Sequence, residues 1–148
     1  MNYNYYTTST GTLDAATASA ITTAYIIYGI FALVILILQI IGMWKIFTKA
    51  GQAGWKSLIP IYNLVTLYKI IGLSPWLLFV YLAPIIPIIG AIAAFVLTIF
   101  QYIYLSKSFG KGTGFTIGLI FLTPIFYIIL GFGNATYIGP NGNVATNN

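Results

Sequence analysis

The uncharged stretch over residues 75–105 constrains the fold of this chain more than any other feature. As one straight helix it would measure roughly 46 Å, which exceeds the ~30 Å thickness of bilayer hydrocarbon. Pro84, Pro87 and Gly90 interrupt its middle. Closely spaced prolines end a helix, because each removes a backbone donor and clashes with the preceding turn. The stretch therefore predicts a tight helical hairpin. Its arms are expected at residues 73–88 and 89–106.

The composition is typical of an integral membrane protein. Of the 148 residues, 59% are hydrophobic and 5% are charged, whereas soluble domains have about 25% charged residues. The fold class predicted is an all-α membrane protein with four transmembrane helices and one interfacial amphipathic helix. A single membrane domain is expected over residues 23–133. The chain has no Cys, His or Glu, so the usual metal ligands, thiolates and general bases are missing, and no cofactor is expected.

The first transmembrane span is expected over about residues 24–44. Gln39 is the one strongly polar residue in it, and Lys45 and Lys49 follow at once. Residues 1–22 contain no basic residue and are expected to form a flexible polar tail. Because basic residues gather on the cytoplasmic side of a membrane, the span is predicted to run from an outer N-terminal end to an inner C-terminal end.

The segment 57–71 is too short to cross the membrane, because Lys56 and Lys69 lie only about 18 Å apart along a helix. It is predicted to be an amphipathic helix that lies flat at the inner surface. Its apolar face would carry Ile61, Leu64, Val65, Tyr68 and Ile71, and its polar face Tyr62, Asn63, Thr66 and Lys69. The alternative is a re-entrant segment that enters the membrane halfway and lines a pore.

The last span is expected over residues 114–132, with a kink at Pro124. Gly114 and Gly118 near its start, and Gly90 and Ala94 in the hairpin, are expected to permit close packing between helices. Residues 134–148 are uncharged and are expected to form a second outer tail. This arrangement places both termini on the outer side of the cytoplasmic membrane and every lysine on its inner side.

Lysines and tryptophans at the ends of apolar segments are expected to anchor the protein at the membrane surface. These are Lys45, Lys49, Lys56, Lys69, Lys107, Lys111, Trp44, Trp55 and Trp76. The net charge of +5 is therefore assigned to contact with the lipid bilayer, and no nucleic-acid partner is expected.

The strings GWKSLIPIYNLVTLYKIIG and KSFGKGTGFTIGLIFLTPIFYIILGFGNATY, separated by PW and a proline-broken apolar stretch, resemble a family of small bacterial multi-pass membrane proteins of unassigned function. Its members are often labelled signal-peptidase-like. The resemblance covers roughly residues 44–139 and implies the same fold. Family members tend to carry an Asp before FGKG and another after LGFG. Here residues 101–106 contain none, and Asn134 stands at the second place.

Peptidase chemistry needs a serine nucleophile and a lysine base that face each other. The candidate pairs here are Lys56 with Ser57, and Lys107 with Ser106 or Ser108. The two members of each pair are adjacent in sequence, and adjacent residues point about 100° apart on a helix. No enzymatic activity is therefore expected. The sequence predicts an accessory, assembly or scaffold component of a membrane complex, with a membrane-protein partner or a second copy of itself. The alternative is a small oligomeric channel or transporter-like protein, since broken helices occur at transport sites.

Overall fold

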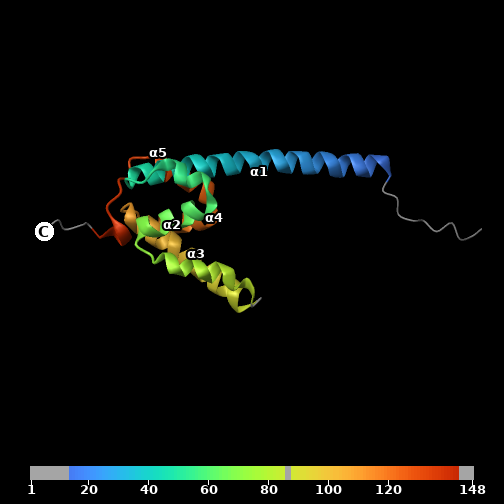
Figure 1. Ribbon diagram of the computed structural model, residues 1–148. Helices are drawn as coiled ribbons and strands as arrows, with labels where there is room; N and C mark the ends of the chain where they lie inside the picture. The colour runs from blue at the N-terminus through green and yellow to red at the C-terminus, as the bar shows by residue number, and fades with distance from the viewer. Residues whose placement is uncertain (1–13, 86–87, 144–148) are drawn as a thin grey trace, which may run out of the picture. The chain divides into compact units, whose positions relative to one another are not determined.

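The computed structural model describes residues 14–85 and 88–143, and every element in them is helical (Figure 1). The elements in chain order are α1 (Ala15–Lys49), η1 (Gly54–Leu58), α2 (Pro60–Ile71), η2 (Pro75–Ile85), α3 (Ile89–Ser108), α4 (Thr113–Phe121), α5 (Thr123–Phe132) and η3 (Pro140–Gly142), where η denotes a 3₁₀ helix. Two of these helices, α1 and α3, are long and apolar enough to cross a membrane. Four such helices are not found in the described residues.

Helix α1 begins earlier than the sequence predicts, because Asp14 caps it. The Asp14 carboxylate accepts a hydrogen bond from the Thr17 backbone N–H at 3.2 Å and another from the Thr17 hydroxyl. This is the usual bonding of an N-cap residue, and it holds the pKa of Asp14 below its ordinary value. The prediction of a flexible tail is therefore wrong for residues 15–22, and residues 1–13 lie outside the described part.

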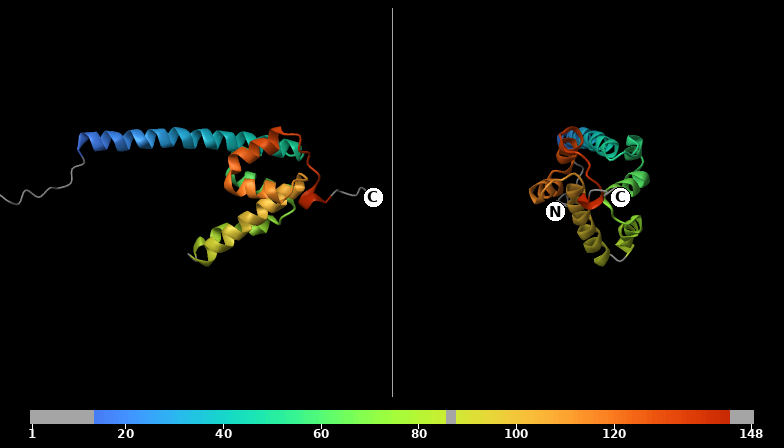
Figure 2. Two further views of the ribbon diagram at one scale, coloured as in Figure 1. Left: turned by 180° about the vertical axis from the view of Figure 1, so that it is seen from behind. Right: turned by 90° about the vertical axis from the view of Figure 1, so that its left-hand side faces the viewer.

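The two arms of the central hairpin, η2 and α3, lie side by side (Figures 1 and 2). The Tyr81 hydroxyl on η2 lies 3.1 Å from the Thr98 hydroxyl on α3. The first arm is a 3₁₀ helix of 11 residues, about 22 Å long, where the sequence predicted an α-helix. Pro84 lies near the end of this arm, and Pro87 falls outside the described residues.

The predicted last span is divided into two short helices that fold back on each other. The break is at Leu122, with φ −133° and ψ 48°. The rings of Phe115 and Phe126 lie 5.0 Å apart, although residues eleven apart on a straight helix are separated by about 16 Å. The prediction of one kinked helix over residues 114–132 is therefore wrong. Pro124 occupies the first turn of α5, where its missing N–H costs nothing.

Helix α5 packs parallel to the C-terminal end of α1. A Cβ atom added at Gly42 would lie 2.8 Å from the Cβ atom of Tyr127, and one added at Gly131 would lie 2.8 Å from the Cβ atom of Lys45. The two glycines thus let the helix backbones approach closely. Because the contacts advance along both helices in the same direction, α1 and α5 end on the same side of the protein.

The buried core lies between these C-terminal ends. It contains Met43, Ile46, Phe47, Leu67, Ile70, Ile71, Leu105, Phe109, Leu119, Tyr127, Leu130 and Ala135. All five described α-helices contribute to it, and the 3₁₀ helix η2 does not. The core is therefore assembled from segments spread over most of the chain, and it stabilises the ends at which the lysines gather.

Residues 134–143 pack against this same end of the protein. The Tyr137 hydroxyl donates a hydrogen bond to the carbonyl of Ile70 at 2.6 Å, and the Ile138 N–H donates to the carbonyl of Ser108 at 2.8 Å. The Asn141 N–H donates to the Ser108 hydroxyl at 3.1 Å. The prediction of a free outer tail from residue 134 is therefore wrong up to residue 143. Uncharged composition suggested a tail, whereas backbone hydrogen bonds hold the segment in place.

Candidate functional site

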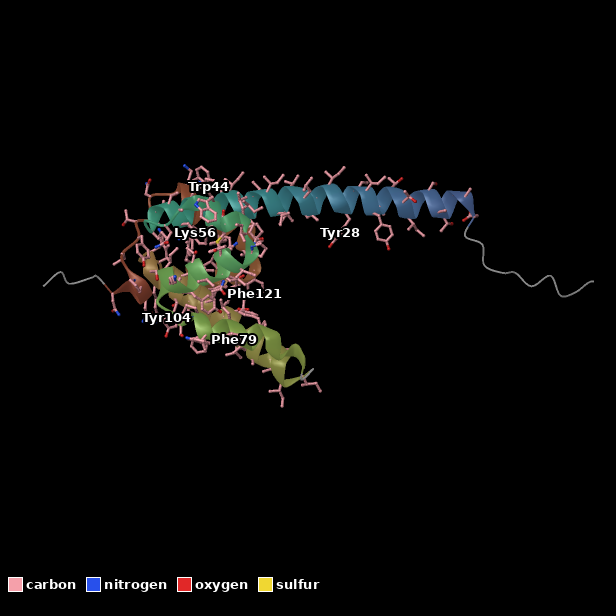
Figure 3. The ribbon with its side chains drawn as sticks, in the orientation of Figure 1. Tyr28, Trp44, Lys56, Phe79, Tyr104 and Phe121 are labelled. Atoms are coloured by element: carbon pink, nitrogen blue, oxygen red, sulfur yellow. The ribbon has the colours of Figure 1, made fainter. Side chains whose placement is uncertain are left out.

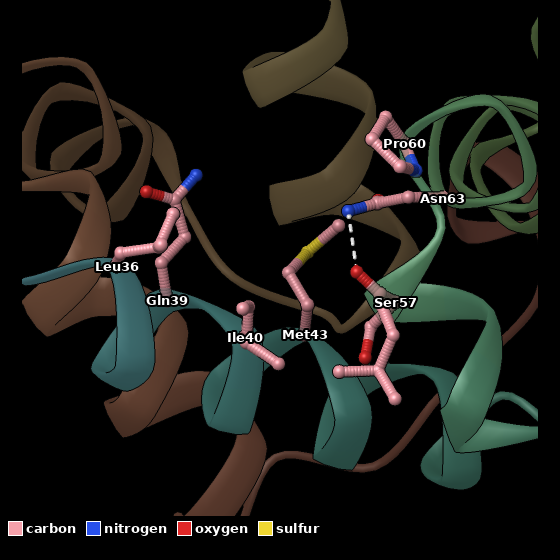
Figure 4. Close-up of a pocket in the computed structure, with 8 residues that line it drawn as sticks. Leu36, Gln39, Ile40, Met43, Ser57, Pro60 and Asn63 are labelled. Carbon is pink, nitrogen blue, oxygen red and sulfur yellow. Dashed lines mark hydrogen bonds between the residues drawn. The ribbon is translucent and has the colours of Figure 1, made fainter. Parts of the chain in front are cut away.

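A pocket of about 290 Å³ lies between the C-terminal half of α1 and the η1–α2 segment (Figure 4). It is lined by Leu36, Gln39, Ile40 and Met43 from α1, by Ser57 and Leu58 from η1, and by Pro60 and Asn63 from α2. Most of this lining is apolar, and three uncharged polar side chains are set into it.

Two polar atoms at this pocket have no hydrogen-bond partner within the described part of the chain. They are the hydroxyl oxygen of Ser57, whose residue is only 4% exposed, and the amide oxygen of Asn63. The Asn63 amide nitrogen does donate to the Ser57 carbonyl, at 3.2 Å (Figure 4). A buried polar group without a partner costs about 1–3 kcal/mol, so native proteins rarely keep one without a reason.

The pocket forms because the chain turns back along α1 directly after Lys49. The Gln52 N–H donates to the carbonyl of Phe47 at 2.8 Å and closes the turn. The Trp44 indole then covers Gly54, where any added side chain would collide with the ring. Pro60 follows as the first residue of α2. The N-terminal end of α2, with free N–H groups in its first turn, therefore comes to lie beside Gln39 and Met43.

The burial pattern along α2 departs in part from the faces that the sequence predicts. Thr66, predicted on the water-exposed face, is only 3% exposed, whereas Ile61, from the face predicted to lie against the lipid, is 75% exposed at the surface of the protein. The prediction that Thr66 is exposed to water is therefore wrong, because this side of α2 packs into the protein. Gln39, the lone strongly polar residue of the predicted first span, meets the start of α2 at the pocket.

A second polar cluster lies between α2, η2 and α3. The Tyr81 hydroxyl is at its centre, 3.1 Å from the Thr98 hydroxyl and 3.5 Å from both the Tyr68 hydroxyl and the Gln101 amide oxygen. Gln101 is 7% exposed. Thr98 and Gln101 are polar residues in an otherwise apolar helix, and the sequence alone does not reveal their tyrosine partners.

The chemistry available at the pocket beside Gln39 and at the cluster around Tyr81 is hydrogen bonding by neutral groups. No group of three or more metal-ligating side chains occurs in the described ranges. Ser57 also lacks the base that a nucleophile requires, because the Lys56 ammonium donates to the side-chain oxygen of Gln52 at 3.0 Å.

The family model fits this part of the chain. The chain belongs to the family of unknown function DUF5684, which matches residues 55–140. The match covers nearly all of η1, all of α2, the polar cluster around Tyr81 and the loop before α4, and it ends at the start of η3. Of the pocket beside Gln39 it covers only the residues from η1 and α2. No curated protein and no solved structure matches the chain.

Among the predicted anchors, Lys49 makes the most contacts. Its ammonium group donates to the carbonyl oxygens of Leu130, Gly133 and Ala135 at 2.7, 2.7 and 2.8 Å. Lysine at a helix C-terminus is favourable because the last carbonyls carry partial negative charge. Lys49 therefore fastens the end of α5 and the segment after it.

The remaining anchors lie at the surface of the protein, and their contact with lipid stays a prediction. The Lys45, Lys107 and Lys111 ammonium groups lie 5.3, 5.8 and 6.0 Å from the rings of Phe132, Tyr104 and Phe115. Lys69 is exposed. Trp44, Trp55 and Trp76 are 40%, 47% and 75% exposed, and Trp76 stacks on Phe79, which is labelled in Figure 3 together with Trp44.

The predicted packing residues behave differently from one another. An added side chain at Gly118 would collide with the ring of Phe126, so this glycine does mark a close contact. Gly114 has nothing within 4 Å of an added Cβ atom, so the prediction is wrong there. On α3, Gly90 is buried and Ala94 is half-buried. Gly42 and Gly131 also mark a close approach of two helices, which the sequence did not indicate.

Proposed function

We infer that this protein is a non-catalytic component of a membrane complex and that it binds a transmembrane helix of a partner protein at the pocket beside Gln39. The observation that carries this proposal is the pair of unpaired polar atoms on Ser57 and Asn63. Both residues line a pocket beside α1, one of the two helices apolar enough to cross a membrane. In hydrocarbon no water is at hand to satisfy such groups, so a polar side chain of a neighbouring helix is the natural partner.

The surroundings of the pocket suit a helix as the occupant. Leu36 and Leu58 at its edge are 54% and 55% exposed, and they can receive the apolar side chains that flank a polar residue on a partner helix. Hydrogen bonds between membrane helices contribute about 0.6–2 kcal/mol each. Two or three of them, together with apolar packing, are enough to select one partner without holding it irreversibly.

The accompanying topology has three crossings, formed by α1, η2 and α3. The η1–α2 and α4–α5 segments enter from the inner side and return to it. This arrangement keeps all six lysines at the inner side of the cytoplasmic membrane, as the positive-inside rule requires. It places the N-terminus outside. The C-terminal segment is placed inside, in contrast to the outer position expected from the sequence, because residues 134–143 bond to the lysine-bearing ends.

Photocrosslinking in intact cells tests the partner-binding proposal. A photoreactive amino acid at Leu36 or Leu58 should yield one adduct of defined size, and the change Asn63→Leu should abolish it. The matched control is the same probe at Phe121, which is 79% exposed and does not line the pocket. Adducts with lipid alone at all three positions, or an adduct that survives both Asn63→Leu and Ser57→Ala, would contradict the proposal.

The alternative of a small channel or transporter has its own supporting observation. The cluster around Tyr81 places four hydrogen-bonding side chains between α2, η2 and α3. One of these elements, η2, is a 3₁₀ helix, and irregular helices of this kind are found at transport sites. Flux of a small polar solute into liposomes that contain only the purified protein would support this function. A Thr98→Val change should then reduce the flux. Flux equal to that of empty liposomes would exclude transport of the solute tested.

A further inference from the structure

A second pocket, of about 250 Å³, lies where α3 ends and α4 begins. It is lined by Ile103, Lys107, Lys111, Gly112, Thr113 and Thr116. Its loop carries the FGKGTGF string, so it is built from the most glycine-rich part of the chain. The partner-binding proposal makes no use of this pocket, and a ligand bound here would be independent of that partner.

The backbone of the loop is arranged so that the first turn of α4 keeps free donors. Gly110 turns the chain with φ 67°, and the Lys111 N–H donates back to the carbonyl of Ser106 at 2.9 Å. Gly112 occupies the N-cap position and has no side chain with which to cap the helix. The N–H groups of Thr113 and Gly114 have no backbone partner in the described part of the chain. Such N–H groups, aligned with the helix dipole, attract an anion.

Thr116 adds a hydroxyl group to this pocket. It is 7% exposed, it lines the pocket, and its hydroxyl has no hydrogen-bond partner among the described residues. A threonine inside a helix usually donates to the carbonyl four residues earlier, as Thr98 does to Ala94 at 2.9 Å. For Thr116 that acceptor is the Gly112 carbonyl.

The Gly112 carbonyl is already fully used. It accepts hydrogen bonds from the Ser106 hydroxyl at 3.1 Å, from the Phe115 N–H at 3.1 Å and from the Thr116 N–H at 3.3 Å. A carbonyl oxygen has only two lone pairs, so it has no capacity left for the Thr116 hydroxyl. That hydroxyl is therefore free to bond to a group inside the pocket.

The charge of the pocket is uniformly positive. Lys107 and Lys111 both line it, and neither has a side-chain carboxylate as a partner, because the single acidic side chain of the protein is Asp14, which caps α1. The rings of Tyr104 and Phe115 lie within 5.8 and 6.0 Å of the two ammonium groups and restrict their positions. Two cations, free backbone donors and a hydroxyl form the set of groups that binds phosphate.

We propose that this pocket binds a phosphate group through Lys107, Lys111, the Thr116 hydroxyl and the N–H groups that open α4. Since α3 is one of the two helices apolar enough to cross a membrane, its lysine-bearing end lies at the level of lipid headgroups. The phosphate therefore belongs either to an anionic phospholipid or to a soluble phosphate monoester that reaches the membrane surface.

Thermal unfolding of the purified full-length protein, freed of lipid in a neutral detergent, tests the proposal. The probes are phosphatidic acid and glycerol 3-phosphate, and diacylglycerol and glycerol are their phosphate-free counterparts. A phosphate-bearing probe should raise the melting temperature in a concentration-dependent way. Stabilisation by phosphatidic acid alone identifies a lipid headgroup as the source, and stabilisation by glycerol 3-phosphate identifies a soluble ligand.

Variants distinguish the pocket from general attraction to a basic surface. Lys107→Gln and Lys111→Gln should each weaken the apparent affinity for the stabilising probe about tenfold or more. Lys69→Gln, a matched change on another element, should leave it unchanged. Thr116→Val should weaken binding and Thr116→Ser should retain it, which separates the hydroxyl from the fold.

Two results would overturn the proposal. The first is that neither phosphate-bearing probe stabilises the protein more than its phosphate-free counterpart. The second is that Lys69→Gln weakens binding as much as Lys107→Gln does, because the attraction would then be to net charge and not to this pocket.

Discussion

Replacing Lys49 by Met should release the C-terminal end of the protein from the core. The Lys49 ammonium donates three short hydrogen bonds to carbonyls in and just after the last turn of α5. A hydrogen bond to a charged group contributes about 1.5–3 kcal/mol. The three do not add fully, because they share one ammonium and because Lys49 is partly open to solvent. We therefore expect the free energy of unfolding to fall by about 2–4 kcal/mol.

Two measurements can detect a change of this magnitude. A loss of this size lowers the melting temperature of a protein of this length by roughly 5–10 °C, which thermal unfolding in detergent can resolve. The chain contains no cysteine, so an Ala135→Cys change provides a single thiol at a position that is 8% exposed. Loss of Lys49 should raise its rate of reaction with a water-soluble maleimide by about 30-fold or more.

Lys69→Met provides the matched control, because Lys69 is exposed and ends a different helix. It should shift the melting temperature by no more than a degree or two. If Lys49→Met and Lys69→Met gave the same melting temperature and the same labelling rate at residue 135, the reasoning would fail. The three hydrogen bonds would then contribute nothing that water does not replace.

Three further changes test other parts of the structure. Thr66→Lys should destabilise the protein more than Leu64→Lys, because Thr66 is 3% exposed and Leu64 is 37% exposed. The reverse order of melting temperatures would contradict the burial of Thr66 and would favour a helix that lies flat with Thr66 toward water. Gly42→Leu should prevent folding or lower the melting temperature sharply, while Gly114→Leu, with open space around it, should be tolerated in the same assay. Burial raises the pKa of Tyr137, so the unfolded chain loses this proton first as the pH rises past about 10. Stability should fall above that pH, and a Tyr137→Phe variant should show a smaller fall in a pH series of melting curves.

The sequence determined the features that depend on local chemistry. Length and hydropathy predicted long apolar helices, of which α1 and α3 are found. Pro84 and Pro87 predicted that residues 75–105 cannot form one straight helix, and two arms lie side by side there. Pro124 predicted an irregularity, although the structure has a new helix there and not a kink, and both Pro60 and Pro124 lie in the first turn of a helix. These inferences hold because a missing N–H and an apolar run act wherever they occur in the chain.

What became of the chain after each break was decided by contacts between distant residues. Pro124 permits either a kinked continuation of the helix or a break after which the chain folds back. Gly118, which accepts the ring of Phe126, accompanies the return. Likewise, Thr66 looks like a residue of a wet face by spacing alone, yet it is buried because α2 packs against other helices.

The proposed function depends on the same distinction. The sequence presented Gln39, Ser57 and Asn63 as three unrelated polar residues, and the turn after Lys49 brought them to one pocket. It presented Lys49 as a surface anchor, whereas the ammonium bonds to carbonyls 81 or more residues away. Hydropathy and proline content state where a helix can form and where it must stop. Only packing decides which helix ends meet, because that choice depends on shape and on unpaired polar groups that lie far apart in the chain.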